Sequence, residues 1–413
     1  AKPDKQDVQQ EYGRMWQLIG NRPIEALRDL PLMTDEVSRG TMDVLTALML
    51  PAWYTNVDLG SLIIGRMSNL SLEHGNCDAS CLNYAWLGLI LGPQSGDYDA
   101  AFRFGQLGVD LVEQHGLDRF KARVYQAFGG HVMQWTRPIR TARSLVQRAF
   151  DVASKLGDLT YASFARNNHI TQMLAIGEPL AEVQHEAEAM IDFAYKARFS
   201  LAVDRVKPQL QLVRSLRGRT PVFGSLSDAG FHEESYERYL DEPPGPTLAT
   251  CWYWVRKLQA RYLAGDYATA LAAADRADRL LWTCPSFFEQ AEYHFYAALA
   301  HAAHDISRVE PERARRIRVI SDHHRQLRLW AEHCPENFQT RAALVGAELA
   351  RIEDRETDAM NLYEQAIRSA RDSDFVHNEA LANELAARFY AARGFEKIAR
   401  VYLQDARHGY LRW

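Results

Sequence analysis

The sequence predicts an all-α solenoid in which helical hairpins stack on one another, and three observations predict it. A Gly-Asp-Tyr turn followed by small residues occurs twice, as GDYDAAF at residues 96–102 and GDYATAL at residues 265–271. Sets of small residues recur about every forty residues, a period typical of stacked repeats. Strand signals are nearly absent, because the chain has no long alternating run of Val, Ile or Thr and no Asn-Gly hairpin.

Predicted second helices of the hairpins share a set of three apolar positions on one face, and in the clearest sets all three residues are small. The clearest sets are Ala101, Gly105 and Gly108, and Ala270, Ala274 and Ala277; weaker sets are Ala142, Val146 and Ala149, Val183, Ala187 and Met190, Ala359, Tyr363 and Ala366, and Ala399, Leu403 and Ala406. Spacings of four and seven residues place each set on one helical face, where the missing bulk lets a neighbouring helix approach closely. The spacing of the sets predicts about eight repeats.

The same pattern divides the chain into regions. Pro138 and Pro179 each precede a small-residue set by a few positions, as expected for prolines in the first turn of a helix. The expected organisation is an N-terminal helical cap at residues 1–67, repeats at 68–222, a linker or irregular insertion at 223–247 that contains DEPPGP, and further repeats at 248–413. A terminal cap is what an open stack requires.

The second Gly-Asp-Tyr segment resembles the tetratricopeptide (TPR) repeat. If Gly265, Tyr267 and Ala270 form the turn and second helix of the pattern, Trp254 falls on the aromatic position of the first helix. The period of about forty residues exceeds the usual TPR length, so the helices or loops are expected to be longer. The fold class predicted is therefore an all-α, TPR-like α-solenoid with an N-terminal helical cap.

Composition narrows the class of partner. The 413 residues are 47% hydrophobic, enough for a large core, and 48 Lys and Arg face 53 Asp and Glu, a net charge of −5. This charge offers no general attraction to nucleic acid or to an anionic membrane. The longest apolar stretch, residues 41–57, contains Asp43 and Pro51 and falls short of a membrane span. Five cysteines without framework spacing indicate reduced thiols. We expect a soluble, cytoplasmic protein with no nucleic-acid partner and no membrane insertion.

Several strings resemble one region of a known signalling family. They are residues 30–52 (LPLMTDEVSRGTMDVLTALMLPA), 69–81 (NLSLEHGNCDASC), 102–125 (FRFGQLGVDLVEQHGLDRFKARVY), 251–267 (CWYWVRKLQARYLAGDY), 330–338 (WAEHCPENF) and 392–413 (ARGFEKIARVYLQDARHGYLRW). Together they resemble the TPR-like helical region of bacterial hybrid proteins that combine a serine/threonine kinase-like domain, a STAND-type ATPase, a GAF domain and a sensor histidine kinase. The resemblance implies a helical region between the ATPase and the GAF domain.

The chain itself carries no catalytic motif of that family. It has no G-x-x-x-x-G-K-[ST] phosphate loop and no kinase H-R-D or D-F-G set. We therefore expect no catalysis and no cofactor in this chain, and kinase and ATPase domains of the same parent chain as its partners. An all-α enzyme is one alternative, because Asp354, Glu356 and Asp358 approximate a magnesium-binding aspartate cluster. A repeat turn explains these three residues more simply.

Polar and aromatic side chains on predicted first helices are the candidate binding residues. They are Asn69, Glu73, His74, Asn167, Asn168, Trp252, Gln259, Tyr262 and His294. Hydrogen-bonding groups on an inner face suit a small polar ligand, but they can equally bridge neighbouring helices. The spacing of His74, Cys77 and Cys81 is explained better by a packed helix start than by a metal site, and His323 and His324 are expected at the surface. The Arg-rich segment 312–330 is expected to form a solvated face of ion pairs.

Besides an all-α enzyme, two functions without catalysis fit these features of the sequence. The first is a non-catalytic sensor superhelix that binds a small ligand or a peptide on its concave face and passes the signal to kinase domains. The second is a protein-protein scaffold that holds a STAND ATPase inactive. A pocket of ligand size would favour the first function, and sensitivity to mutations on the outer face would favour the second.

Overall fold

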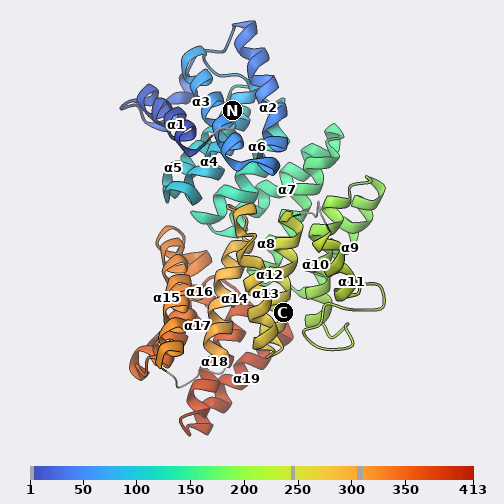
Figure 1. Ribbon diagram of the computed structural model, residues 1–413, viewed down its shortest axis with the longest axis vertical. Helices are drawn as coiled ribbons and strands as arrows, with labels where there is room; N and C mark the ends of the chain where they lie inside the picture. Colours follow the sequence, from blue (N-terminus) through green and yellow to red (C-terminus); the bar gives the residue numbers. More distant parts are fainter. Residues whose placement is uncertain (1–3, 243–246, 305–309) are drawn as a thin grey trace. The chain divides into compact units, whose positions relative to one another are not determined.

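The computed structural model describes residues 4–242, 247–304 and 310–413, which are almost entirely helical (Figure 1). The first helices are α1 (Lys5–Ile19), η1 (Ile24–Asp29), α2 (Glu36–Thr55), α3 (Val57–His74), α4 (Asp78–Ser95), α5 (Tyr98–Gln114), α6 (Lys121–Ala127), η2 (Phe128–Val132), η3 (Met133–Trp135), α7 (Ile139–Leu156), α8 (Leu159–Ile176), α9 (Leu180–Lys196) and α10 (Ser200–Leu216). The remaining helices are α11 (Glu233–Asp241), α12 (Thr247–Leu263), α13 (Tyr267–Asp278), η4 (Leu281–Thr283), α14 (Glu289–Ala303), α15 (Glu310–His333), α16 (Pro335–Ile352), α17 (Glu356–Asp372), α18 (Val376–Ala391) and α19 (Glu396–Arg412). Within these ranges no strand is formed, so the all-α prediction is confirmed.

The chain folds as two compact units. The first runs to Thr136 and takes in Thr141–Ala165, and the second comprises Arg137–Arg140 and Arg166–Trp413. The first unit contains α1, α2 and α3, followed by paired helices; α3 runs through residue 67, where the sequence suggested the end of the cap. Of the helices in the described ranges, none has both the length and the apolar composition needed to cross a bilayer.

The two Gly-Asp-Tyr turns form the same local structure. Gly96 and Gly265 end the first helix of their hairpins with φ angles of 73° and 78°, in the left-handed region that glycine adopts without strain. The next residues, Asp97 and Asp266, each accept a hydrogen bond from the backbone amide three residues later, at 2.9 Å and 3.2 Å. The motif therefore recurs because glycine ends one helix and aspartate caps the next.

Small residues in α5 allow close contact with neighbouring helices in the first unit. A Cβ atom added at Gly105 would lie 2.3 Å from the ring of Phe128, and one added at Gly108 would lie 2.5 Å from the carbonyl oxygen of Cys81. Real Cβ atoms are not found at such distances from fixed neighbours. The predicted close approach of a neighbouring helix is thus confirmed for this set.

Most other members of the small-residue sets are also buried. The exception is Leu403, which is 50% exposed on α19. Among the described helices α19 packs mainly on α18, through Ala399, Ala406 and Gly409, so Leu403 has no second neighbour to cover it. The sequence pattern correctly identified the small residues but not the exposure of this leucine.

Consecutive helices pack against each other as hairpins in several places within the described residues. The pairs that the contacts show are α4 with α5, α12 with α13, α14 with α15, α16 with α17, and α18 with α19. In the second unit the first helices α10, α12, α14, α16 and α18 contact one another in succession and form an inner layer. The second helices bury little more than their small residues, as in α13 and α17, and form the outer layer.

The stack of the second unit turns tightly enough for its early and late hairpins to touch. The amide of Leu180, at the start of α9, donates to the carbonyl oxygen of Trp413 at 2.7 Å. The guanidinium of Arg341 in α16 donates to the carbonyl oxygen of Ala175 in α8 at 3.3 Å. The inner layer of this unit therefore closes on itself.

The predicted insertion contains an irregular loop followed by the short helix α11. The loop is anchored by Arg214 of α10, whose guanidinium pairs with Asp228 at 2.8 Å and with Glu188 at 2.9 Å. Within the DEPPGP string, residues 243–246 lie outside the described residues. Helix α11 contacts α10 through Tyr236 and Tyr239, whose hydroxyls donate to the carbonyl oxygen of Asp204 at 3.1 Å and to its carboxylate at 3.0 Å.

Candidate functional site

Three predicted residues lie on α3 in the first unit and do not form a common site. Asn69 is fully buried, and its amide donates to the carbonyl oxygen of Glu11 at 3.1 Å and to its carboxylate at 2.5 Å. Glu73 pairs with Arg14 at 2.5 Å, and His74 is exposed in the last turn of the helix. Asn69 thus joins α3 to α1.

The inner layer of the second unit contains a buried polar network that includes the predicted Asn167. The amide of Gln209 on α10 donates to Asn167 on α8 at 3.2 Å. The hydroxyl of Thr171, one turn further along α8, donates to Glu289 on α14 at 2.8 Å. The same carboxylate oxygen pairs with Arg256 on α12 at 2.8 Å, and both charged side chains are almost fully buried. Four successive inner helices therefore meet at one ion pair.

Three more predicted residues belong to this layer. Gln259 accepts a hydrogen bond from Arg256 at 3.2 Å and donates to the hydroxyl of Tyr296 at 3.3 Å. The rings of Tyr262 and Tyr296 pack edge to face, and Trp252 packs in the same manner on Phe287. The predicted residues of this face are all buried: Asn167, Asn168, Trp252, Gln259 and Tyr262.

A second buried ion pair continues the network toward α16. Arg341 pairs with Glu292 of α14 at 2.7 Å, and neither side chain is more than 5% exposed. Burial raises the pKa of the neighbouring Glu289 carboxyl, although the charge of Arg256 and the hydrogen bond from Thr171 oppose the shift. The inner layer is filled by its own polar side chains, so a ligand that used Asn167 or Gln259 would have to open this network first.

His294, the last predicted residue, contacts a second histidine instead of a cavity. Its Nδ1 atom lies 2.9 Å from Nδ1 of His323 on α15, so one of the two nitrogens must carry a proton and the other must accept it. Burial, together with the other imidazole, lowers the pKa of His294 to about 3. Burial also lowers the pKa of His323, to about 4. The pair holds α14 to α15 while both rings are neutral.

The expected surface position of His323 and His324 is wrong. His323 is only 9% exposed because it packs against α14, and His324 is half-buried beside Gly346 of α16. As adjacent residues on a helix, they point to different faces, as the sequence indicated. Both faces of α15 are covered because this helix lies against both α14 and α16.

A cleft of about 530 Å³ opens beside the histidine pair, between α13, α14 and α15. Its walls carry both charges: Asp275 and Asp278 come from α13, and Arg315, Arg316 and Asp322 come from α15. Such a volume accommodates a small ligand or a few side chains of a protein. Two further hollows are a cavity of about 510 Å³ between α15, α16 and α17, and an apolar groove of about 480 Å³ between α2 and α3 in the first unit.

The basic helix α15 is bound to neighbouring groups on several sides. Arg313 donates to the carbonyl oxygen of Ile352 at 2.6 Å, and Arg316 donates to that of His304 at 3.1 Å. Arg325 forms an exposed pair with Asp322 at 2.9 Å. The expected ion pairs are present, but some of the arginines hold helices together instead of facing solvent alone.

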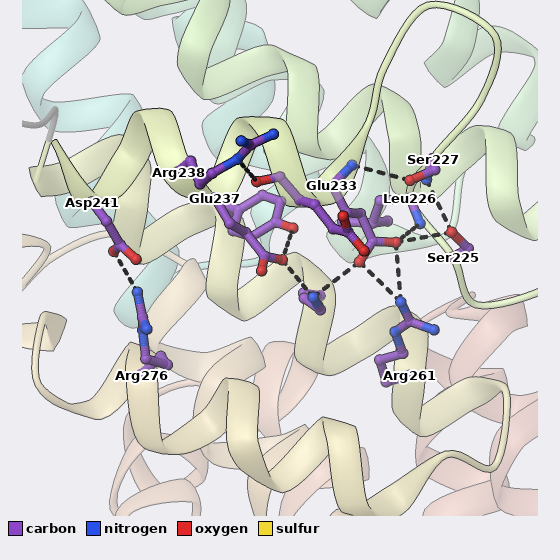
Figure 2. Close-up of polar contacts among 12 residues, drawn as sticks. Ser225, Leu226, Ser227, Glu233, Glu237, Arg238, Asp241, Arg261 and Arg276 are labelled. Carbon is purple, nitrogen blue, oxygen red and sulfur yellow. Dashed lines mark hydrogen bonds and ion pairs between the residues drawn. The ribbon is translucent and has the colours of Figure 1, made fainter.

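A contact between acidic and basic side chains that was not predicted from the sequence lies at α11 (Figure 2). Glu233 pairs with Arg261 at 2.9 Å and with Lys257 at 3.0 Å, both on α12. At the other end of α11, Asp241 pairs with Arg276 of α13 at 2.5 Å. Glu237, between these two acids, pairs with Lys257 at 2.5 Å and also accepts a hydrogen bond from the hydroxyl of Tyr253. We call Lys257, Arg261 and Arg276 the basic strip.

Glu233 is the most deeply held of the three acids. Its carboxylate also accepts hydrogen bonds from the amide of Leu226 at 2.5 Å and from the hydroxyl of Ser225 at 2.9 Å (Figure 2). Burial alone would raise its pKa, but the hydrogen bonds from Lys257 and Leu226 and the nearby positive charges outweigh burial, so the pKa is lowered. The carboxylate therefore stays ionised and fixes the loop to α12.

The spacing of charges was the signal that could have revealed this contact. Glu233, Glu237 and Asp241 follow one another at intervals of four residues, as do Lys257 and Arg261, so each set lies on one helical face. The composition of residues 223–247 predicts a linker or irregular insertion, which assigns none of these acids to a helix. Among the described residues, no three His, Cys, Asp or Glu side chains are grouped to hold a metal ion.

Comparison with known proteins agrees with this architecture. Residues 221–397 match the family model described as CHK1-like, TPR repeats. The match extends from the loop before α11 to the start of α19, so the chain is an all-α, TPR-like solenoid. TPR repeats generally mediate protein interactions and are generally not catalytic.

The chain is also similar to hybrid signal transduction histidine kinase G of Dictyostelium discoideum. The two are 24% identical over 173 residues, which are 41% of this chain and 5% of that protein. The matched segment thus spans a small part of the relative. Together the two similarities support a TPR-like region of a kinase-type protein, as the sequence strings indicated, while the ATPase and GAF neighbours stay a prediction.

Proposed function

We propose that this chain is a non-catalytic, cytoplasmic regulatory region of a multidomain signalling kinase, which binds kinase and ATPase domains of its parent chain through its outer surface. The TPR-like repeats and the similarity to a hybrid histidine kinase support this proposal. The observation that carries it is the filled inner layer, where Arg256 pairs with Glu289 and Arg341 pairs with Glu292. Recognition is left to surfaces outside this network, such as the cleft that the outer helices α13 and α15 form with α14.

A binding experiment tests the proposal. The chain is mixed with the separately produced kinase and ATPase domains of the parent, and affinity is measured by calorimetry. We expect binding to at least one domain, and a loss of about tenfold or more for Arg315→Glu, because this charge lines the outer cleft. Asn167→Ala, in the inner layer, is the matched control and is expected to keep the affinity. The absence of binding to every domain would contradict the proposal.

The second candidate function is a sensor that binds a small polar ligand in the inner layer. One observation favours it: the buried Asn167 amide nitrogen and one Glu289 carboxylate oxygen have no hydrogen-bond partner among the described residues. A ligand would satisfy such groups, provided it prefers an opened network over the closed one. A thermal shift of the chain with small metabolites, abolished by Asn167→Ala, together with no binding of kinase or ATPase domains, would favour this function.

A further inference from the structure

Helix α11 presents a regular pattern of acids and apolar residues to the rest of the second unit. Glu233, Tyr236, Glu237, Leu240 and Asp241 follow one another at intervals of three and four residues or stand adjacent, so they share one face. Leu240 is 5% exposed, and the ring of Tyr236 packs against that of Tyr253 on α12. The docked face of α11 is therefore acidic at three positions and apolar at two.

The basic strip under α11 is shaped by groups that do not belong to α11. The guanidinium of Arg276 lies over the ring of Trp254, 4.5 Å from its centre, and the ammonium of Lys257 lies 5.4 Å from the same centre. Cations over an aromatic ring are attracted by its face and stay in place without a carboxylate partner. Removal of α11 would thus leave a ready site for negative charge.

The acidic side chains of α11 become more exposed from its first residue to its last. The Glu233 side chain is 8% exposed in its pair with Lys257, whereas Asp241 and Arg276 are 55% and 41% exposed in theirs. Pairs as exposed as the last one are worth about 0.2–1 kcal/mol and are screened by salt. A helix of nine residues is also too short to be stable when undocked. The C-terminal part of α11 is therefore the part that a competing helix can replace.

We propose that the basic strip on α12 and α13 is a docking site for an acidic amphipathic helix of a partner, and that α11 occupies this site within the chain. The expected partner helix carries acids at positions i, i+4 and i+8 and an aromatic or leucine side chain at i+3 and i+7. This inference rests on the proposed function in one respect, namely that the repeats bind protein.

A peptide in solution tests the site. The probe is a fluorescent peptide with the sequence of residues 231–242, FHEESYERYLDE, and its binding to the full chain is followed by anisotropy at low salt. We expect Glu237→Ala with Asp241→Ala to bind the peptide at least about tenfold more tightly than the unaltered chain, because the internal competitor is weakened. Lys257→Glu added to this variant should abolish binding, and a peptide with Gln at the acidic positions should not bind.

The unaltered chain gives a second measurement that does not depend on the variants folding. Trypsin cleavage after Arg238, on the exposed face of α11, should become several-fold faster at high salt and in the presence of excess unlabelled peptide. Cleavage after Arg400 of α19 serves as the internal control and should change little. The inference would be overturned if the rate of cleavage after Arg238 changed with neither salt nor peptide. It would also be overturned if the Lys257→Glu variant still bound the peptide. If the parent domains still bind the chain in that case, the proposed function stands without it.

Discussion

The inner layer and the basic strip of the second unit are built from the same pairs of Arg or Lys with Glu or Asp, but they differ in burial. Arg256 with Glu289 and Arg341 with Glu292 are almost fully withdrawn from water. Asp241 with Arg276 keeps about half of each side chain exposed. The presence of an ion pair therefore does not show how firmly it holds two helices together. Its burial decides whether the pair fixes the helices or can be replaced by a pair with another partner.

Physical chemistry explains the difference. A buried pair loses the hydration of both charges, so its net contribution to stability is small while both partners are present. Once one partner is removed, however, the other remains as a costly unpaired charge. An exposed partner is rehydrated instead, and little is lost. Buried pairs therefore hold the inner helices in one register, and exposed pairs leave α11 replaceable.

The largest effect is expected for Arg341→Ala. The substitution leaves Glu292 buried without its partner and removes the hydrogen bond to Ala175, so the free energy of unfolding should fall by about 3–5 kcal/mol. Unfolding in urea, followed by circular dichroism, gives the value. The matched control is the double variant Arg341→Met with Glu292→Leu, which should recover most of the loss because no unpaired charge is left. If Arg341→Ala lowers the free energy of unfolding by less than about 1 kcal/mol, the buried pair contributes no more than the exposed pairs of the basic strip.

The histidine pair extends the contrast to pH. Between pH 6.5 and about 3 the unfolded chain binds a proton at the His294 imidazole, and the folded chain does not, because its pKa is lowered to about 3. The contribution of His294 to the free energy of unfolding should therefore be constant above pH 6.5. It should decrease as the pH falls further, by about 2–3 kcal/mol at pH 4.5.

The variant His294→Gln isolates this effect, since glutamine can hydrogen bond but does not titrate. Its free energy of unfolding should fall less between about pH 7 and about pH 4.5 than that of the unaltered chain. The slope of this free energy against pH should differ by the uptake of about one proton, or about 1.4 kcal/mol per pH unit. Equal slopes for the two proteins would show that the imidazole is protonated in the folded state. The contact between α14 and α15 would then resemble the exposed strip more than the inner layer.

Backbone contact gives a third way to sharpen the comparison, this time in the first unit. Gly108→Ala would place a Cβ atom 2.5 Å from the carbonyl oxygen of Cys81 and should lower the free energy of unfolding by about 1–3 kcal/mol. Gly13→Ala, in α1, meets no atom within 4 Å and should raise it by about 0.5–1 kcal/mol. Equal effects at both positions would show that α4 and α5 do not pack as closely as described.

The sequence predicted the fold correctly where a structural feature requires one particular residue type. Glycine at 96 and 265, followed by the capping aspartates, identified the turns, and Gly105 and Gly108 identified a close helix contact. These features are local, because they depend on a glycine backbone or on the absence of a side chain. The same logic failed for Leu403, whose burial depends on a second neighbouring helix and not on its own helix.

The arrangement of the polar groups could not be predicted in the same way. Asn167 and Gln259 were recognised as polar residues of an inner face, but their partners Gln209 and Tyr296 lie 42 and 37 residues away on other helices. A period in the sequence shows that such helices are neighbours and does not show how tightly the stack turns. That turn brings Thr171 of α8 against Glu289 of α14, which lies 118 residues away in the sequence.

The smallest effect, and the most direct comparison with Arg341→Ala, is expected for Asp241→Ala. Because both partners of the pair with Arg276 are about half exposed, the free energy of unfolding should fall by only about 0.2–1 kcal/mol, and by less still in about 0.5 M salt. Arg276→Gln and the double variant complete a cycle that isolates the energy of the pair. A loss above about 2 kcal/mol that persists in high salt would make α11 as fixed as the inner helices, and no partner helix could then replace it.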